Sequence, residues 1–227
     1  SLRNTAPVLT LGSMELPGSL SIVQAGTLSI PGTVSALSHA IDATGDVLVG
    51  SASATNAALL YASGDISIST PGSVIVRGSD VTPLAASAVL ADGNLQVAAG
   101  NVSIVGGGAL LAPAAMRGEA VEMSIGSELH VTGGSGHLSP AVLSSGSNID
   151  LTVGTAVRVT EGKGLLSVAR IQTEIKDGVI HISFPNLEEG GYFVNGIEGK
   201  THHGQTGFFT LNKPAKVGKT LLLEYGD

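Results

Sequence analysis

The residues of this chain that could do chemistry are few, and two adjacent histidines stand out among them. His202 and His203 lie in the polar, Gly-containing segment KTHHGQTG. Imidazole nitrogen is a common ligand of zinc and of haem iron. Adjacent residues on a strand point to opposite faces, so both could bind one metal only from an irregular loop. No acidic residue lies within three positions of the pair, so we predict no metal site and no cofactor and keep His202 and His203 as weak candidate ligands.

A second chemistry to consider is glycosidic bond cleavage, which uses two carboxyl groups about 5–9 Å apart. Asp46 and Asp65 each follow a glycine that opens a repeat unit, and Asn94 stands at the same place in the next unit. If the units stack, the two acids could meet at one corner. Aspartate beside glycine is also typical of turns, because its short side chain accepts hydrogen bonds from nearby backbone. We therefore predict no catalytic residues and no enzyme activity.

Aromatic side chains gather near the C-terminus and give the candidate binding surface. All four phenylalanines and two of the three tyrosines come after residue 177. Aromatic rings offer large, rigid contact area. We name Tyr192, Phe193, Phe208 and Phe209 as a ligand or partner surface. The same residues could equally cover the open end of a repeat array.

This change in composition also predicts a domain boundary. All six lysines lie after residue 160, so charge and aromatic content both change near Gly178. We expect β-helix repeats over residues 1–177 and a C-terminal cap or small β subdomain over residues 178–227.

The elements that position these residues are predicted from a repeat of glycine, a small polar residue, and then apolar–x–apolar. The repeat reads GSLSI from Gly18, GDISI from Gly64 and GNLQV from Gly93. Apolar alternation with period two is typical of a strand with one buried face. The units come in pairs, and each pair is followed by a small apolar run such as SAVLA (87–91), ALLAPAA (109–115) or GLLSVA (164–169). Three short strands per unit predict one coil of a parallel β-solenoid, and starts at 18, 45, 64, 93, 118 and 146 predict about six coils.

An antiparallel β-sandwich is the alternative fold. A sandwich favours larger core residues and more hairpin turns of the Asn-Gly kind. Aromatic residues make up only 3% of the chain and such turns are few, so we favour the solenoid.

Composition and charge exclude several classes of function. Hydrophobic residues make up 43% of the chain and charged residues 13%. These values argue against disorder, because disordered chains are polar and highly charged. A net charge of −7 argues against nucleic-acid partners, which need clustered Lys and Arg.

Two further exclusions follow from uncharged stretches and from the absence of cysteine. Residues 93–116 contain no charged residue, but they contain glycines and Pro113, so we expect no membrane span. The chain has no cysteine, which rules out disulfides and suits any redox compartment.

Strings such as SGDISIST, DGNLQVAAGNVSIVGGGALLA and SGSNIDLTVGTAVRVTEGKG resemble the passenger repeats of filamentous haemagglutinin-like exoproteins. The resemblance covers roughly residues 17–177. It implies a right-handed parallel β-helix, bacterial export by two-partner secretion, and a place among further repeats of a longer parent chain.

The resemblance also implies a function. We expect a secreted or cell-surface bacterial segment with a structural or adhesive role in attachment or biofilm formation, whose partner is a host-cell or matrix glycan or protein receptor. Two alternatives stay open. One is a β-helix that binds or cleaves polysaccharide, of the lyase or phage-tail kind, and the other is a segment that captures haem or metal through His202 and His203.

Overall fold

The structure is a computed structural model that describes residues 1–174, 178–183 and 221–224. Every regular element in these ranges is a β-strand, and the strands form a 14-stranded sheet and a 7-stranded sheet. All pairings within the coils are parallel, and each joins a strand to its counterpart in the next coil. The chain is therefore a parallel β-solenoid, as the repeat predicts, and the sandwich alternative is wrong.

Each coil has three faces. The first face holds β1 (Leu2–Asn4), β4 (Leu20–Gln24), β7 (His39–Ala43), the start of β10 (Ile66–Arg77), the start of β12 (Leu95–Val105), β14 (Val121–Ile125), β17 (Ile149–Val153) and β20 (Val179–Ser183). The second holds β2 (Val8–Thr10), β5 (Thr27–Ile30), β8 (Val47–Val49), the ends of β10 and β12, β15 (Glu128–Thr132) and β18 (Ala156–Thr160). The third is the 7-stranded sheet of β3 (Met14–Glu15), β6 (Thr33–Ala36), β9 (Ala58–Ala62), β11 (Ser87–Ala91), β13 (Ala114–Gly118), β16 (Ala141–Ser145) and β19 (Ala169–Thr173).

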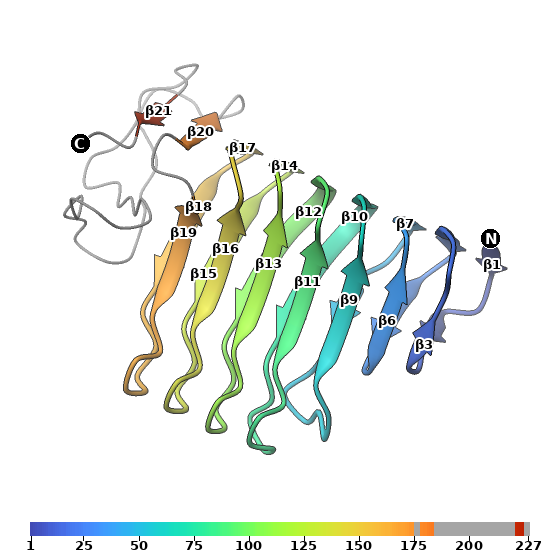
Figure 1. The fold of residues 1–227 in the computed structure, drawn as a ribbon, viewed down its shortest axis with the longest axis horizontal. Helices are drawn as coiled ribbons and strands as arrows, with labels where there is room; N and C mark the ends of the chain where they lie inside the picture. The colour runs from blue at the N-terminus through green and yellow to red at the C-terminus, as the bar shows by residue number, and fades with distance from the viewer. Residues whose placement is uncertain (175–177, 184–220, 225–227) are drawn as a thin grey trace.

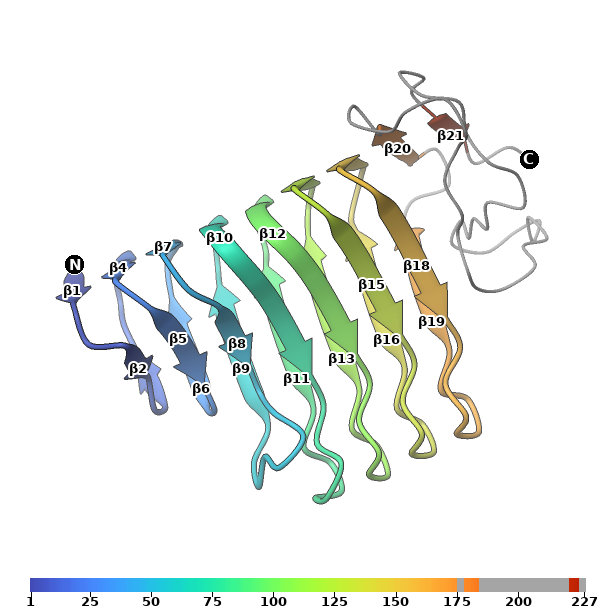
Figure 2. The same ribbon diagram turned by 180° about the vertical axis from the view of Figure 1, so that it is seen from behind.

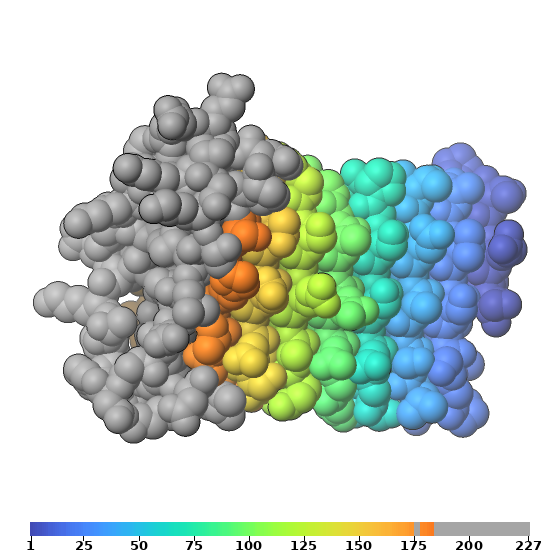
Figure 3. Space-filling model, turned by 90° about the horizontal axis from the view of Figure 1, so that it is seen from above, coloured from blue at the N-terminus to red at the C-terminus, as the bar shows by residue number. Residues whose placement is uncertain are grey.

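The coils stack along the long axis of the molecule. Figures 1 and 2 show the strands of each face side by side from β1–β3 to β17–β19, with the corner loops aligned along one edge. Seen from above, successive coils form adjacent bands across the described residues (Figure 3). Because each strand pairs with the coils before and after it, the solenoid presents the same type of surface repeatedly along its length.

The number of coils differs slightly from the six predicted, and one predicted coil start is misplaced. No glycine precedes β1 or β2, so the repeat does not mark the start of the first coil. Gly45 precedes β8 on the second face, whereas the coil in question begins at β7, where His39 replaces the expected apolar residue. The predicted start at Gly45 is therefore misplaced, which makes the spacing of the predicted starts uneven on either side of it.

The interior is filled by aliphatic side chains from alternate strand positions. Leu28, Leu60, Leu129 and Leu143 are fully buried, and the hydrophobic core of the described residues contains no Phe, Tyr or Trp. Three strands and three corners enclose a narrow space, which Val, Leu, Ile and Ala can fill without strain. The low aromatic content of the repeats is therefore a requirement of this interior.

Two predicted strands are wrong in their extent. ALLAPAA and GLLSVA were expected to be third-face strands, but β13 begins at Ala114 and β19 at Ala169. The leucine pairs at positions 110–111 and 165–166 lie before these strands, in exposed corner loops. An apolar run predicts burial when taken alone, and these leucines are not buried.

At the C-terminal end, β20 continues the first face. Ile180 pairs with Ile149 of β17, and β20 also pairs in antiparallel fashion with β21 (Leu221–Glu224). This antiparallel pair fits a β cap, and the remainder of the predicted cap lies outside the described residues. The boundary between residues 177 and 178 stays a prediction. Among the described residues, no helix has the length and apolar character that a membrane crossing requires.

Candidate functional site: the outward faces and one corner of the solenoid

The residues predicted to bind a partner or a metal cannot be placed. Tyr192, Phe193, Phe208 and Phe209 lie outside the described residues, and so do His202 and His203. Both predictions therefore stay predictions, and the surfaces described below are those of the solenoid itself.

The structure separates the two aspartates that were considered as a catalytic pair. Asp46 lies at the corner between β7 and β8, and Asp65 lies at a different corner, between β9 and β10. The Oδ1 atom of Asp46 accepts a hydrogen bond from the Ser73 amide at 2.8 Å, and Asp65 Oδ1 accepts one from the Asn94 amide at 2.7 Å. Each carboxylate thus caps a backbone N–H of the following coil, which is a turn-forming role.

Polar side chains form a column along the first face. Gln96, Glu122, Asp150 and His181 occupy equivalent positions of β12, β14, β17 and β20 and pair in register. Gln96 Nε2 donates to Glu122 Oε2 at 3.3 Å, and His181 Nδ1 lies 3.2 Å from Asp150 Oδ1. These amide, carboxylate and imidazole groups can exchange hydrogen bonds with the hydroxyls of a polar ligand.

A shallow hollow lies beside Gln96 and Glu122 of this column. Its polar lining consists of Ser67, Ser69, Gln96, Glu122 and Ser124 from β10, β12 and β14. Hydroxyl, amide and carboxylate groups thus converge on one spot of the first face. Within the ranges that the structure describes, no group of three or more His, Cys, Asp or Glu residues is arranged to hold a metal ion.

The second face carries a small charged cluster on β15 and β18. Glu128 Oε2 lies 2.5 Å from His130 Nε2, and its other oxygen accepts a hydrogen bond from Arg158 at 3.3 Å. The hydrogen bond from His130, followed by that from Arg158, holds the pKa of Glu128 below its usual value. The three side chains are partly exposed, so the cluster contributes little to stability.

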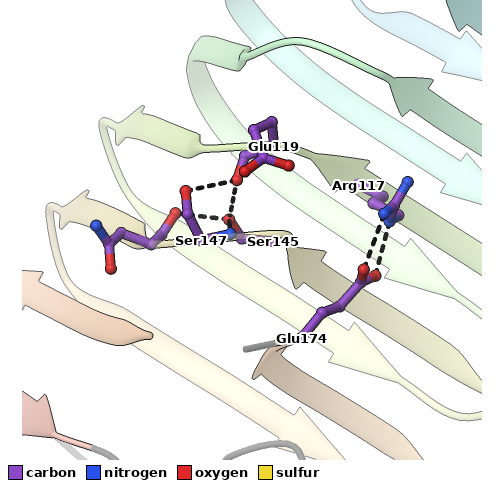
Figure 4. Close-up of polar contacts among 6 residues, drawn as sticks. Arg117, Glu119, Ser145, Ser147 and Glu174 are labelled. Carbon is purple, nitrogen blue, oxygen red and sulfur yellow. Dashed lines mark hydrogen bonds and ion pairs between the residues drawn. The ribbon is translucent and has the colours of Figure 1, made fainter. Parts of the chain in front are cut away.

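The third face is bridged by an ion pair that spans three coils. Arg117 on β13 donates through Nε and Nη2 to both oxygens of Glu174, at 2.7 and 2.8 Å, across the intervening strand β16 (Figure 4). This bidentate bond lowers the pKa of Glu174. In the same region, the main-chain carbonyl of Glu119 accepts hydrogen bonds from the hydroxyls of Ser145 and Ser147, at 2.8 and 2.7 Å (Figure 4). These contacts connect neighbouring coils. Because the groups hydrogen-bond to one another, we interpret them as structural contacts of the third face.

The corner between the second and third faces has an unusual backbone in four successive coils. Each of these loops contains a leucine with a positive φ angle: 64° at Leu84, 55° at Leu111, 56° at Leu138 and 58° at Leu166. The loops are aligned by main-chain bonds such as Leu84 N to Leu110 O at 3.0 Å. A bulky residue rarely adopts this left-handed conformation, because its Cβ crowds the following carbonyl.

Buried serines hold these corner loops from the inside. The Ser139 hydroxyl is fully buried, donates to Ala109 O at 2.7 Å and accepts from the Ala112 amide at 3.1 Å. Ser167 has the same role in the next coil, where its hydroxyl donates to Gly136 O. The loops therefore have a defined conformation and hold their leucines in fixed positions.

Sequence reasoning missed this corner because it interpreted the leucine pairs at positions 110–111 and 165–166 as strand residues. A signal was nevertheless present, since Leu84, Leu111, Leu138 and Leu166 recur at nearly equal intervals along the chain. Such a period marks equivalent positions in successive coils. Whether such a position is buried or exposed depends on the loop conformation, which hydropathy alone does not show.

Comparison with known proteins adds no family assignment. No protein-family model, curated protein or solved structure matches the chain. The functional argument therefore depends on the residues and surfaces described above.

Proposed function

We propose that this chain is a structural and adhesive segment of a secreted bacterial surface protein, which mediates attachment or biofilm-type contacts and does not catalyse a reaction. The resemblance of its repeats to haemagglutinin-like passenger repeats supports both the adhesive role and the location at the cell surface. A host-cell or matrix glycan or protein is the class of receptor that this role requires.

The observation that carries the proposal is the repetition of short polar groups on the first face. Ser69, Ser124, Thr152 and Ser183 occupy one column at equivalent positions of β10, β14, β17 and β20, with Ala98 of β12 between the first two. Adjacent strands in such a column are separated by about 4.8 Å. Many weak contacts with a repetitive surface add up to firm attachment, because each contact raises the effective concentration of the next.

Attachment can be measured with microspheres that carry the purified chain. The spheres would be passed over surfaces coated with separate matrix proteins and glycans, with albumin-coated spheres as the control. We expect the chain to retain spheres on at least one coating well above the albumin control. Equal retention of the two kinds of sphere on every coating would overturn the proposal.

Polysaccharide binding is the second candidate, and the hollow on the first face favours it. Gln96, Glu122 and Ser124 present amide, carboxylate and hydroxyl groups of the kinds that bind sugar hydroxyls. The double substitution Gln96→Ala/Glu122→Ala should weaken binding to a glycan array. Glu128→Ala on the second face is the matched control, because it removes a carboxylate far from the hollow. No glycan binding by the native chain, or equal loss in both variants, would count against this candidate.

A further inference from the structure

One edge of the solenoid is apolar, and this apolar character is concentrated in the corner loops described above. We call the six exposed leucines there the leucine ridge: Leu84, Leu110, Leu111, Leu138, Leu165 and Leu166. They account for six of the ten large apolar side chains that are exposed in the described residues. Their exposed fractions range from 38% at Leu111 to 69% at Leu84. Figures 1 and 2 show the loops that carry them in one row along an edge of the molecule.

The fold itself does not require leucine at these positions. Glycine adopts a positive φ without steric cost, whereas another L-residue costs about 1 kcal/mol or more in that conformation. The four leucines with φ between 55° and 64° therefore destabilise their own loops and place apolar surface in water. The same strained and exposed residue in four successive coils indicates that the side chain serves a contact outside the coil.

The size of the ridge matches one half of a specific protein interface. From their exposed fractions, the six leucines together expose about 600 Å², so that two ridges would bury about 1200 Å², at the lower end of the range for stable interfaces. Val81 is 66% exposed in the same row of loops and adds to this area. An apolar patch of this size is at the upper end of what a monomer exposes and commonly serves a function.

The spacing of the ridge identifies the partner. Consecutive ridge loops belong to consecutive coils, and their backbones are joined by Leu111 N to His137 O at 2.9 Å and Leu138 N to Leu165 O at 2.8 Å. The ridge therefore repeats with the strand spacing of about 4.8 Å. A second copy of the chain has the identical spacing, so its leucines can interdigitate with these along the whole ridge.

The charges at the two ends of the ridge are compatible with the same partner. At the Leu84 end, Arg77 and Asp80 form an ion pair at 2.6 Å, and at the other end Glu161 and Lys163 precede Leu165. Each end of the ridge therefore carries one acid and one base, so a second copy can pack against it without an excess of like charge. An anionic membrane is a poorer partner, because such a surface attracts basic segments and the chain carries a net charge of −7.

We propose that two copies of this chain associate ridge to ridge, about a twofold axis that passes near the middle of the leucine ridge. Such an isologous interface uses the same patch on both copies and closes after two. This inference does not rest on the proposed adhesive role, since a dimer could form whether or not the chain attaches to other surfaces.

The mass of the chain in solution tests the proposal. Sedimentation equilibrium at protein concentrations up to about 100 µM should give twice the monomer mass of 22.6 kDa. The double variant Leu111→Glu/Leu138→Glu should weaken association about 100-fold or more, because it buries unpaired carboxylates in the interface. Leu37→Glu is the control, since Leu37 is 53% exposed and lies away from the ridge. A monomeric native chain, or a dimer that the double variant forms equally well, would overturn the proposal.

Single cysteines give a second measurement that requires no charge in the interface. Because the chain has no cysteine, each introduced thiol can link only to its copy in another molecule. Leu111→Cys, near the twofold axis, should form a disulfide-linked dimer on mild oxidation, and Leu37→Cys should do so far less. Equal linking of the two variants would refute the ridge interface. If the native chain stays monomeric but floats with phosphatidylcholine vesicles, the dimer proposal is wrong and the ridge binds a lipid surface.

Discussion

The close backbone contacts between coils can be tested at Gly134, in the corner loop before β16. A Cβ atom at this position would lie 2.8 Å from the Gly106 carbonyl carbon, 2.9 Å from Ser139 Cβ, and closer still to Gly107 O. Two of these three neighbours are backbone atoms of the preceding coil, which cannot rotate away. Gly134→Ala must therefore push two coils apart.

The expected cost follows from these contacts. Overpacking by one methyl group costs about 1–3 kcal/mol. Separating the coils also weakens neighbouring bonds such as Gly136 N to Gly107 O, at about 1 kcal/mol each. We therefore expect Gly134→Ala to lower the free energy of unfolding by about 2–4 kcal/mol.

Gly18→Ala is the matched control, because a Cβ there meets nothing within 4 Å. Both substitutions restrict the backbone of the unfolded chain equally. The difference between their free energies of unfolding therefore reports the contact of the new Cβ atom in the folded state. Urea unfolding followed by far-UV circular dichroism measures both. If Gly134→Ala unfolds within about 0.5 kcal/mol of Gly18→Ala, the close stacking of the coils described here is wrong.

Three further predictions concern the interior and the outer faces. His39 is buried, and its Nε2 donates a hydrogen bond to Tyr61 O at 2.7 Å. Burial lowers the pKa of its imidazole. As the pH falls below about 6.5, this imidazole therefore takes up a proton in the unfolded chain before it does so in the folded chain. The native chain should lose stability over that range, and His39→Leu should remove this loss. Urea titrations at about pH 7.5 and about pH 5.5 would measure the free energy of unfolding of both proteins. The same pH dependence in both proteins would contradict the assignment of this loss to His39. Leu129→Ala should lower the free energy of unfolding, measured with denaturant, by about 2–5 kcal/mol. Leu37→Ala, at an exposed position, should lower it by less than about 0.5 kcal/mol. Similar losses in the two variants would argue against the core described here. Arg117→Ala should change the unfolding free energy by less than about 1 kcal/mol, because the pair with Glu174 is exposed, and a larger loss would mean that this bridge is a main tie between coils.

Much of the fold could be predicted from the sequence because strand alternation is a local property. In SAVLA, Ser87, Val89 and Ala91 point inward and the residues between them point outward, as period two requires. The same logic fails where a single residue breaks the pattern. The imidazole of His39 occupies a core position, so β7 does not match the repeat and the sequence predicts the coil start at Gly45.

The candidate surfaces were harder to predict, because they depend on which residues the coils bring together. Gln96 and Glu122 are far apart in the chain but adjacent on the first face, and only the register of β12 and β14 shows it. The corner leucines show the opposite failure. Leu111 has the sequence context of a core residue, and its exposure depends on a left-handed backbone conformation that no local pattern specifies.

The central claim is that this chain acts by binding through its surface and not by catalysis. The most direct measurement is incubation of the native chain with a panel of neutral and acidic glycans and matrix proteins, with bound chain and newly released glycan ends measured in the same wells. We predict retention of the chain on at least one coating and no release of glycan ends from any substrate. Reproducible cleavage of a glycan by the purified chain, lost on Gln96→Ala/Glu122→Ala, would contradict the account.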